Sequence, residues 1–173
     1  MNSSDIKNYT IREAIKSDMQ AVSIIFNKII LNTTATFEEH PYTVEKWNKI
    51  FDSKIENKYP FLVAEMANQV VAYGTYGVFR YASGYFITVE HSLHVDQKFR
   101  GLGIGQSILS NLIDIAAKSG IHNLIAAIDT ENHISIQLHK KFGFTEVGRL
   151  NNIAKKFSKY VSLMLMQKKL YEK

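Results

Sequence analysis

A glycine-rich turn at residues 100–105 is the feature that most restricts how this chain can fold. A segment with strand character at 86–95 comes before it, and a helix follows in which apolar residues recur on one face from Ile104 onward. Gly120 can end that helix, and a short buried strand at 123–128 comes next. A strand, a helix and a second strand connected in this order form a crossover unit, which requires its two strands to be parallel.

The segments around this crossover unit favour antiparallel pairing. We expect strands at 9–13, 61–66, 70–79, 144–150 and 161–167, the second and third forming a hairpin across residues 67–69. Helices are expected at 18–31, where Ser17 and Gln20 match a capping box, at 44–55 after the N-cap Thr43, and at 134–141. The predicted fold class is therefore α/β (α+β), with a mixed, mostly antiparallel central sheet and helices on both faces.

Composition is that of an ordinary globular protein. Of 173 residues, 46% are hydrophobic and 21% charged, and no Gly/Ser-rich linker or repeat divides them, so we expect one domain over residues 1–173. The absence of cysteine excludes a disulfide framework, a thiol nucleophile and a cysteine zinc site. Residues 1–7 are polar, and no apolar run approaches the roughly 20 residues of a membrane span, so we expect a soluble cytoplasmic protein.

The net charge of +5 favours an anionic ligand but is too small to indicate a dedicated nucleic-acid-binding protein. The glycine-rich turn suits an anion, because N–H groups at a helix N-terminus lack partners and the helix dipole adds partial positive charge. A tight turn that only packs the helix against the sheet is the alternative. No Gly-Lys-Ser/Thr follows, and Gln106 stands in place of a third glycine, so the turn fits neither a nucleoside triphosphatase loop nor the dinucleotide fingerprint.

Two motifs in sequence order resemble the acetyl-CoA-binding motifs of the GNAT superfamily of N-acetyltransferases. They are Arg100-x-x-Gly103-x-Gly105 after one strand and Asn132-x-x-Ser135-x-x-Leu138-His139-x-x-x-Gly143-Phe144 after the next. More narrowly, residues 32–38, 77–80 and 88–92, Lys156-Phe157 and Met166-Gln167 are similar to the phosphinothricin acetyltransferase family, whose members acetylate phosphinothricin or methionine sulfone and sulfoximine. The resemblance covers nearly the whole chain and implies a GNAT-like fold with a splayed parallel strand pair.

The resemblance implies acetyl-CoA as co-substrate and no metal. The strand at 86–95 would separate from its parallel neighbour, and the pantetheine arm would lie in the gap, where a bulge would offer a backbone N–H to the thioester oxygen. The diphosphate would lie on the glycine-rich turn. The residues expected to bind the cofactor are Leu93, His94, Val95, Arg100, Gly101, Leu102, Gly103, Ile104, Gly105, Gln106, Asn132, Ser135 and Lys141.

Two side chains are candidate catalytic groups. Glu90 matches the glutamate proposed as base in the resembled family, and a partly buried carboxylate there could take the amine proton; a structural glutamate paired with a lysine is the alternative. His139 stands where many superfamily members have a tyrosine that protonates the departing thiolate, and an orienting or CoA-contacting role is its alternative. His91 and His94 point to different faces of one strand, so we expect no zinc pair.

An amino-acid acceptor carries a carboxylate, for which Arg80 offers a bidentate partner. The resemblance further implies that Phe37 packs against the acceptor side chain and that Lys156 reaches a polar oxygen. Glu90 would contact the amine itself. These residues form the expected acceptor site.

The chain departs from the family pattern near this acceptor site. Ala82 stands where a second arginine is common, and Ser158, Tyr160 and Ser162 replace glycine, tryptophan and aspartate. Peptide N-termini or polyamines are therefore alternative acceptors, and a non-catalytic CoA-binding regulator, or a nucleic-acid partner using lysines at 155–159, is the alternative from another class. We expect first an N-acetyltransferase for a small amino-acid-like amine, with a homodimer implied by the resemblance and no nucleic-acid or membrane partner.

Overall fold

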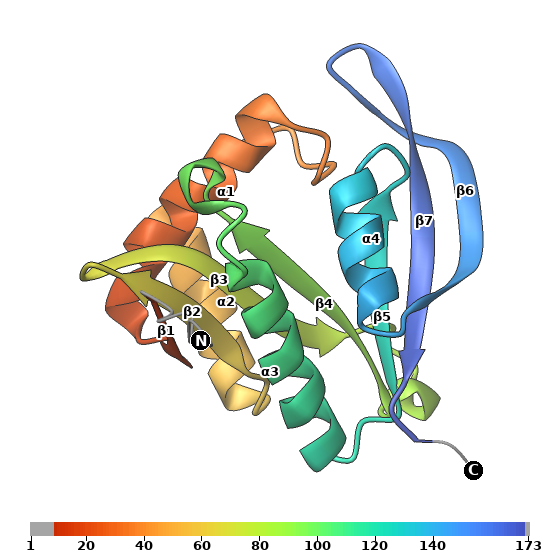
Figure 1. The fold of residues 1–173 in the computed structure, drawn as a ribbon, viewed down its shortest axis with the longest axis horizontal. Coiled ribbons are helices and arrows are strands. Elements are labelled where there is room, and N and C mark those ends of the chain that lie inside the picture. The colour runs from red at the N-terminus through yellow and green to blue at the C-terminus, as the bar shows by residue number, and fades with distance from the viewer. Residues whose placement is uncertain (1–8, 172–173) are drawn as a thin grey trace, which may run out of the picture.

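The computed structural model describes residues 9–171, in which a strand, two helices, three strands, a helix, a strand, a helix and two strands follow one another (Figure 1). The strands are β1 (Thr10–Glu13), β2 (Phe61–Met66), β3 (Gln69–Val78), β4 (Thr88–Val95), β5 (Asn123–Asp129), β6 (Thr145–Lys156) and β7 (Lys159–Lys169). The helices are α1 (Met19–Asn32), α2 (Val44–Glu56), α3 (Ile104–Lys118) and α4 (His133–Lys141). Short 3-10 turns lie at Lys16–Asp18, Ser83–Tyr85 and Gln97–Phe99.

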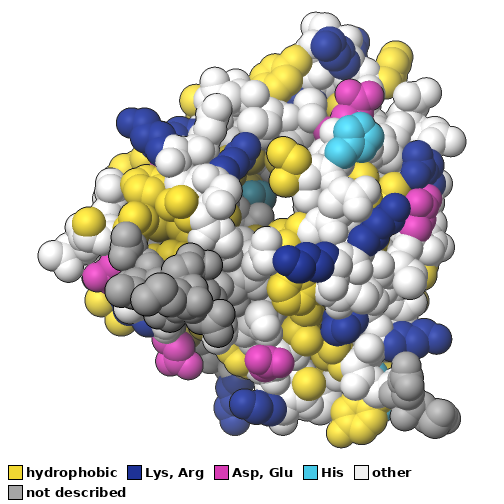
Figure 2. Space-filling model, viewed as in Figure 1, with side chains coloured by type: hydrophobic (Ala, Val, Ile, Leu, Met, Phe, Trp, Pro, Cys, Tyr) yellow, Lys and Arg dark blue, Asp and Glu magenta, His cyan; other side chains and the backbone are white. Residues whose placement is uncertain are grey.

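The strands form one sheet in the order β1-β2-β3-β4-β5-β7-β6. Only β4 and β5 are parallel, and the other neighbours are antiparallel. Helices α1 and α2 cover one face and α3 and α4 the other, so the predicted fold class is confirmed. Strands β4 and β5 diverge toward their carboxyl ends in Figure 1, and the surface is hollowed between β4 and α4 in Figure 2.

Two hairpins are closed by two-residue turns with left-handed backbone. Ala67 and Asn68 join β2 to β3, which confirms the predicted hairpin, although Gln69 already belongs to β3 rather than to the turn. Phe157 (φ 50°) and Ser158 (φ 62°) join β6 to β7, although two-residue turns with positive φ are usually formed by Gly, Asn or Asp. The predicted final strands at 144–150 and 161–167 are therefore too short, because the hairpin continues to this unrecognised turn.

The start of α1 differs from the prediction. The expected capping box of Ser17 and Gln20 is wrong, because Asp18 is the N-cap residue and the helix begins at Met19. The Asp18 carboxylate instead accepts a hydrogen bond from the backbone N–H of Ile15 at 2.8 Å. That bond closes a 3-10 turn ahead of the helix.

Two other helix ends agree with the prediction. The hydroxyl of Thr43 accepts a hydrogen bond from the backbone N–H of Lys46 at 3.2 Å and caps α2. Gly120 follows α3 with φ of 73°, a conformation that side chains other than glycine rarely adopt. Both ends are thus determined by local sequence.

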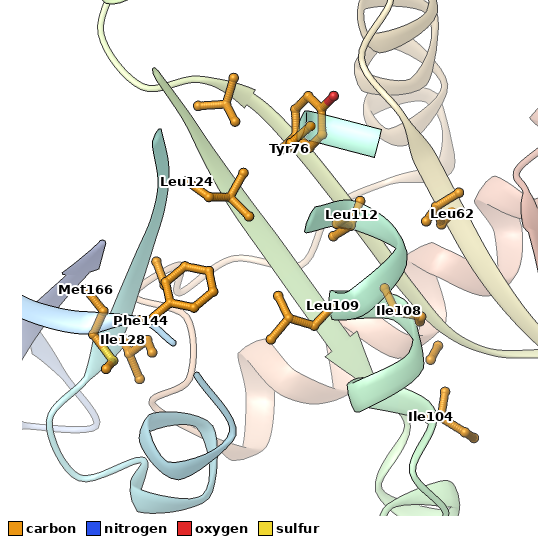
Figure 3. Packing of buried hydrophobic residues seen from close by; sticks show 14 of the residues in the cluster. Leu62, Tyr76, Ile104, Ile108, Leu109, Leu112, Leu124, Ile128, Phe144 and Met166 are labelled. Atoms are coloured by element: carbon orange, nitrogen blue, oxygen red, sulfur yellow. The ribbon is translucent and has the colours of Figure 1, made fainter. Parts of the chain in front are cut away.

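Each face of the sheet has its own core. On the side of α1 and α2, Tyr73 of β3 packs against Trp47, with ring centroids 5.4 Å apart. On the other side, α3 presents Ile108, Leu109 and Leu112, all fully buried, to the strands (Figure 3). Burying one such side chain stabilises a fold by roughly 1.5–3 kcal/mol. These three buried side chains fix α3 on the sheet and thereby position the glycine-rich turn at the start of the helix.

We predict that Gly74→Ala destabilises the protein by about 1 to 3 kcal/mol, because a Cβ atom on Gly74 would lie 2.4 Å from the buried Ile108 Cγ2. The matched control is Gly148→Ala, where a Cβ atom would meet nothing within 4 Å. Denaturant unfolding of both variants measures the difference. Equal stabilities would show that α3 is not held closely against β3.

Candidate active site

The gap between β4 and β5 is the central feature of the site. The parallel ladder runs through Thr88–Asn123 and Val89–Leu124 and ends at Glu90–Ile125. Beyond it, β4 continues to Val95 in contact with β3, while β5 continues to Asp129 in contact with β7. The splayed parallel pair predicted from the resemblance is therefore confirmed. Leu93, His94 and Val95, predicted to bind the cofactor, all lie on the part of β4 that borders the gap.

The β4 strand carries no bulge in this region. Its register with β3 is regular from Ala72–Val95 to Val78–Val89. The bulge expected from the resemblance is therefore wrong for the β3–β4 pair, because each residue of β4 has one partner on β3. A backbone N–H that faces the gap, and could bind the thioester oxygen, would therefore come from a regular position of β4.

The glycine-rich turn leads into α3 at the edge of the gap. Gly101 and Gly103 have φ of 82° and 77°, a backbone that favours glycine, and Gly103 is the N-cap of α3. The first intrahelical bond runs from Ser107 N–H to the Gly103 carbonyl, so the N–H groups before it, at 104–106, have no carbonyl one turn back to pair with. Here the site offers backbone donors and positive helix-dipole charge to an anion.

The remaining residues of the turn have different surroundings. Ile104 is 1% exposed and belongs to the core, so only its backbone can serve a ligand, whereas Leu102 is 50% exposed. A Cβ atom at Gly105 would lie within ordinary contact distance of Leu138, Leu93 and Val95 side chains, so this glycine faces the gap. The Arg100 guanidinium folds back, with Nε donating to the Val95 carbonyl at 3.3 Å.

Helices α3 and α4 are joined above the gap by residues predicted to bind the cofactor. Lys141 Nζ donates to Gln106 Oε1 at 2.9 Å. Asn132 caps α4, and its Oδ1 accepts from the backbone N–H of Ser135 at 3.2 Å. The structure therefore brings the two sequence motifs to the same side of the sheet, where one extended ligand can reach both.

Glu90 lies at the last rung before the strands separate, and it is half-buried. It is directly opposite Gly77 of β3, on the face covered by α1 and α2. Burial raises the pKa of the Glu90 carboxyl, while the positive charges of Arg80 and Lys54 lower it. The net effect is a raised pKa, which makes the ionised carboxylate a stronger proton acceptor, as a general base requires.

His139 lies on the other face of the sheet, buried against β4. Its Nδ1 is 2.7 Å from the carbonyl oxygen of Ser135, which can only accept, so Nδ1 carries the hydrogen. Nε2 of the neutral ring is then an acceptor and receives the N–H of His91 Nε2 at 2.9 Å. Burial lowers the pKa of both rings. In this arrangement the His139–His91 pair is neutral and links α4 to β4.

The residues predicted for the acceptor come from two places: Arg80 from the β3–β4 connection, and Phe37 and Lys156 from the α1–α2 loop and the end of β6. Arg80 is exposed, with its guanidinium 4.9 Å from the ring centroid of Phe79, and Phe37 is half-buried in the α1–α2 loop. Lys156 is only 1% exposed, and its Nζ donates to the backbone carbonyl of Thr36 at 2.7 Å. Burial lowers the pKa of the Lys156 ammonium. Lys156 therefore anchors the α1–α2 loop.

A cleft of about 410 Å³ lies beside that loop. It is lined by Ile30, Leu31, Glu39, His40, Lys156, Phe157 and Ser158. The α1–α2 loop is held a second time two residues before Thr36, where the Thr34 hydroxyl donates to the buried carboxylate of Asp129 at the end of β5. Sequence reasoning missed Thr34 and Asp129, because their pairing joins residues 95 positions apart.

Sequence reasoning also missed Lys54 and the partnership of His91. A lysine near the end of an amphipathic helix is ordinarily a solvated residue, and nothing local distinguishes Lys54 from its neighbours. For His91 the sequence does give an indication of a role in the site, because this residue lies between the two candidates Glu90 and His94 on the same strand. Its partner His139 could be assigned only once α4 was placed on the sheet.

Within residues 9–171, no group of three or more His, Asp or Glu side chains could hold a metal ion. None of the helices in that range is long and apolar enough to cross a membrane.

Comparison with known proteins identifies the family. The acetyltransferase (GNAT) domain family matches residues 11–165. This chain belongs to the GNAT acetyltransferase family. It is 36% identical over 159 residues to an L-methionine sulfoximine/L-methionine sulfone acetyltransferase of Pseudomonas aeruginosa. The aligned region covers 91% of this chain and 92% of that protein. It is also 35% identical over 166 residues to the L-amino acid N-acyltransferase MnaT of Escherichia coli, and this aligned region covers 95% of each protein.

Solved structures support the same assignment. An N-acetyltransferase from Staphylococcus aureus Mu50 superposes with a TM-score of 0.93 at 38% identity, over 95% of this acetyltransferase and 99% of that chain. The acetyltransferase yncA from Salmonella typhimurium, solved with its cofactor acetyl-CoA, has a TM-score of 0.93 at 34% identity over 96% of both chains. The protein is an N-acetyltransferase that uses acetyl-CoA. The gap beyond Glu90 and the N–H groups of the glycine-rich turn fit a long ligand with a diphosphate.

We predict that the acetyltransferase loses stability as pH falls below about 6.5. Burial lowers the pKa of His91 to about 3 and that of His94 to about 4, so the unfolded chain takes up these protons first. Each such proton reduces the free energy of unfolding by about 1.4 kcal/mol per pH unit. Glu90 acts in the opposite sense, because its pKa is raised.

The variant His94→Phe should reduce this acid sensitivity, because its ring would keep contact with Phe26 and Tyr73 without a titrating group. Replacement of the exposed His40 by Gln is the control and should leave the slope unchanged. Denaturant unfolding between about pH 7 and pH 5 measures the slope. An identical slope in wild type and His94→Phe would contradict the prediction.

Proposed function

We propose that this acetyltransferase acetylates the amino group of small amino-acid-like acceptors of the methionine sulfone, methionine sulfoximine or phosphinothricin type. The observation that carries the proposal is the position of Glu90, half-buried at the last rung of the β4–β5 ladder and under the positive charge of Arg80. A base and a cation for a carboxylate are thereby available beside the gap. Relatives that share about a third of the sequence, such as the Pseudomonas aeruginosa enzyme, are named for such acceptors.

Acetyl-CoA supplies the acetyl group as a thioester. The backbone of residues 93–95 offers strand-type hydrogen bonds along the gap, and the N–H groups at Gly101–Gly105 hold the diphosphate. Gln106 and Lys141, already joined by a hydrogen bond, stand next to that anion site. Asn132 and Ser135 at the start of α4 border the same ligand, and Arg100 contributes positive charge.

In this proposal Glu90 accepts the proton that the amine loses as its nitrogen attacks the acetyl carbon. The carbon–sulfur bond of the thioester breaks, and CoA leaves as a thiolate that takes its proton from water. His139 has an orienting role: its Nδ1–H is bound to Ser135, and its Nε2 lone pair is taken by His91. A ring in this state has no proton to give at Nε2. The His139–His91 pair therefore positions α4, and with it the cofactor side of the gap.

On the acceptor side, Arg80 binds the carboxylate and Phe37 packs against the acceptor side chain. Lys156 acts through the backbone of Thr36, which fixes the loop that holds Phe37. With Ala82 in place of a second cation, the carboxylate rests on a single guanidinium. Carboxylate recognition is then weaker than a two-arginine clamp would give.

We also propose that the chain acts as one domain and as a cytoplasmic homodimer. All the strands belong to a single sheet, with β6 at its edge. Val147, Leu150 and Ile153 on this strand are between 41% and 54% exposed, and an unpaired edge with apolar side chains suits a second copy of the chain. Size measurement in solution, with Ile153→Lys as the disrupting variant, tests the dimer.

The activity is tested by incubating the protein with acetyl-CoA and an acceptor panel of L-methionine sulfone, phosphinothricin, a short peptide and spermidine. We expect CoA release with the amino acids, and a decrease of about 10²- to 10⁴-fold in kcat for Glu90→Gln. Acetyl-CoA affinity of this variant should stay within about twofold, because the carboxylate does not contact the cofactor's anionic groups. Preference for peptide or polyamine, or full activity of Glu90→Gln, would contradict the proposal.

Arg80→Met should raise the KM for L-methionine sulfone by about tenfold or more, because a charge-assisted contact to the carboxylate is lost. The amide of the same acceptor lacks the carboxylate and should be affected much less. Arg80→Lys, which keeps the charge without the planar fork, is the matched variant. An equal effect on acid and amide would show that Arg80 does not bind the carboxylate.

A further inference from the structure

Lys54 lies in the last turn of α2, and its half-buried side chain reaches across to β3. Its ammonium donates a hydrogen bond to the carbonyl oxygen of Tyr76 at 2.9 Å and lies 5.6 Å from the ring centroid of Tyr59. Burial lowers the pKa of Lys54, while the charge of Glu90 raises it. Withdrawing an ammonium group from water costs free energy, so its position requires a compensating interaction.

Gly77 makes room for this ammonium. A Cβ atom on Gly77 would lie 2.2 Å from Lys54 Nζ and 3.6 Å from its Cε, so any other residue would displace the lysine. The Lys54 ammonium thus occupies the space where a β3 side chain would otherwise begin.

That space lies beside Glu90. Gly77 and Glu90 are directly opposite on β3 and β4, and opposite residues of antiparallel strands place their Cβ atoms on one face, about 4.5–5.5 Å apart. Lys54 Nζ therefore lies within roughly 8 Å of the Glu90 Cβ, with its charge on the same side of the sheet as the carboxylate. Across residues 9–171 the two groups make no direct ion pair, so they interact through space.

Among the described residues, other charged and titratable groups also lie on this face. Asp129 at the end of β5 and Lys156 at the end of β6 both contact the α1–α2 loop. Arg80 comes from the β3–β4 connection, Tyr59 follows α2, His94 is four residues further along β4, and Lys169 lies at the far end of β7. Arg80 and Lys54 are the cations that lower the pKa of Glu90. Under the proposed function, Arg80 is neutralised by the acceptor carboxylate during turnover.

We propose that Lys54 is a positioning residue for acetyl transfer, whose ammonium, held over Gly77, keeps Glu90 ionised when the acceptor occupies Arg80. The inference rests on the proposed function, in which Glu90 is the base. Lys54 contacts neither the acceptor nor the cofactor in this role. It acts through the protonation state of Glu90 and sets the lowest pH at which the enzyme works.

The test compares Lys54→Met with wild type in acetylation of L-methionine sulfone from about pH 5.5 to pH 9.5. We expect the acidic limb of kcat to move up by about one pH unit, so that the rate falls about tenfold on that limb and stays within about twofold on the alkaline plateau. NMR titration of the Glu90 carboxyl carbon in the free protein should show the same upward shift. An unmoved limb and titration, or a loss equal at every pH, would overturn the proposal.

Matched variants separate charge from structure. Lys54→Arg keeps the positive charge and should follow wild type, whereas Lys54→Gln keeps a donor for the Tyr76 carbonyl without charge and should follow Lys54→Met. Lys49→Met, on the exposed side of the same helix, should leave the profile unchanged. If the acidic limb of wild type survives in Glu90→Gln, the proposed base fails; the carboxyl titration then still tests Lys54 independently of activity.

Discussion

The parallel pairing of β4 with β5 stops at Glu90, and the rest of the site depends on this interruption. A continuous ladder would satisfy the backbone of both strands and leave no place for a ligand between them. Because β3 holds β4 to its end and β7 holds β5 to its end, each strand stays ordered without the other. The fold thus keeps an open edge inside a sheet, and α3 and α4, each packed on one of the two strands, frame it.

The sheet also separates the two chemical tasks. Glu90 and His91 are neighbours in the chain but face opposite sides of the sheet. The carboxylate lies under the positive charges of Arg80 and Lys54, while the imidazole meets His139 of α4. Burial acts on both and with opposite consequences. It raises the pKa of the carboxyl, in keeping with the base proposed for it. It lowers the pKa of the imidazoles, which keeps them neutral and lets them link α4 to β4.

The fold class and the placement of both cofactor motifs could be predicted because their signals are local. A glycine with positive φ at the start of α3, a threonine cap on α2 and alternating apolar residues each act within a few positions. The hairpin turn at Phe157 and Ser158 was missed because neither residue type favours a left-handed backbone. The α1 capping box was wrong because Asp18 binds the chain before the helix rather than within it.

The sequence by itself determined the element order, the crossover that makes one strand pair parallel, the family, and Glu90 as a candidate base. Only the tertiary structure decided what surrounds that carboxylate: the ammonium of Lys54 over Gly77, the His139–His91 pair beneath the sheet, and the use of Lys156 to hold a loop. Local patterns fix backbone conformation through steric limits and short-range hydrogen bonds. Charge and proton affinity depend instead on distance and burial, which distant parts of the chain create only when they pack together.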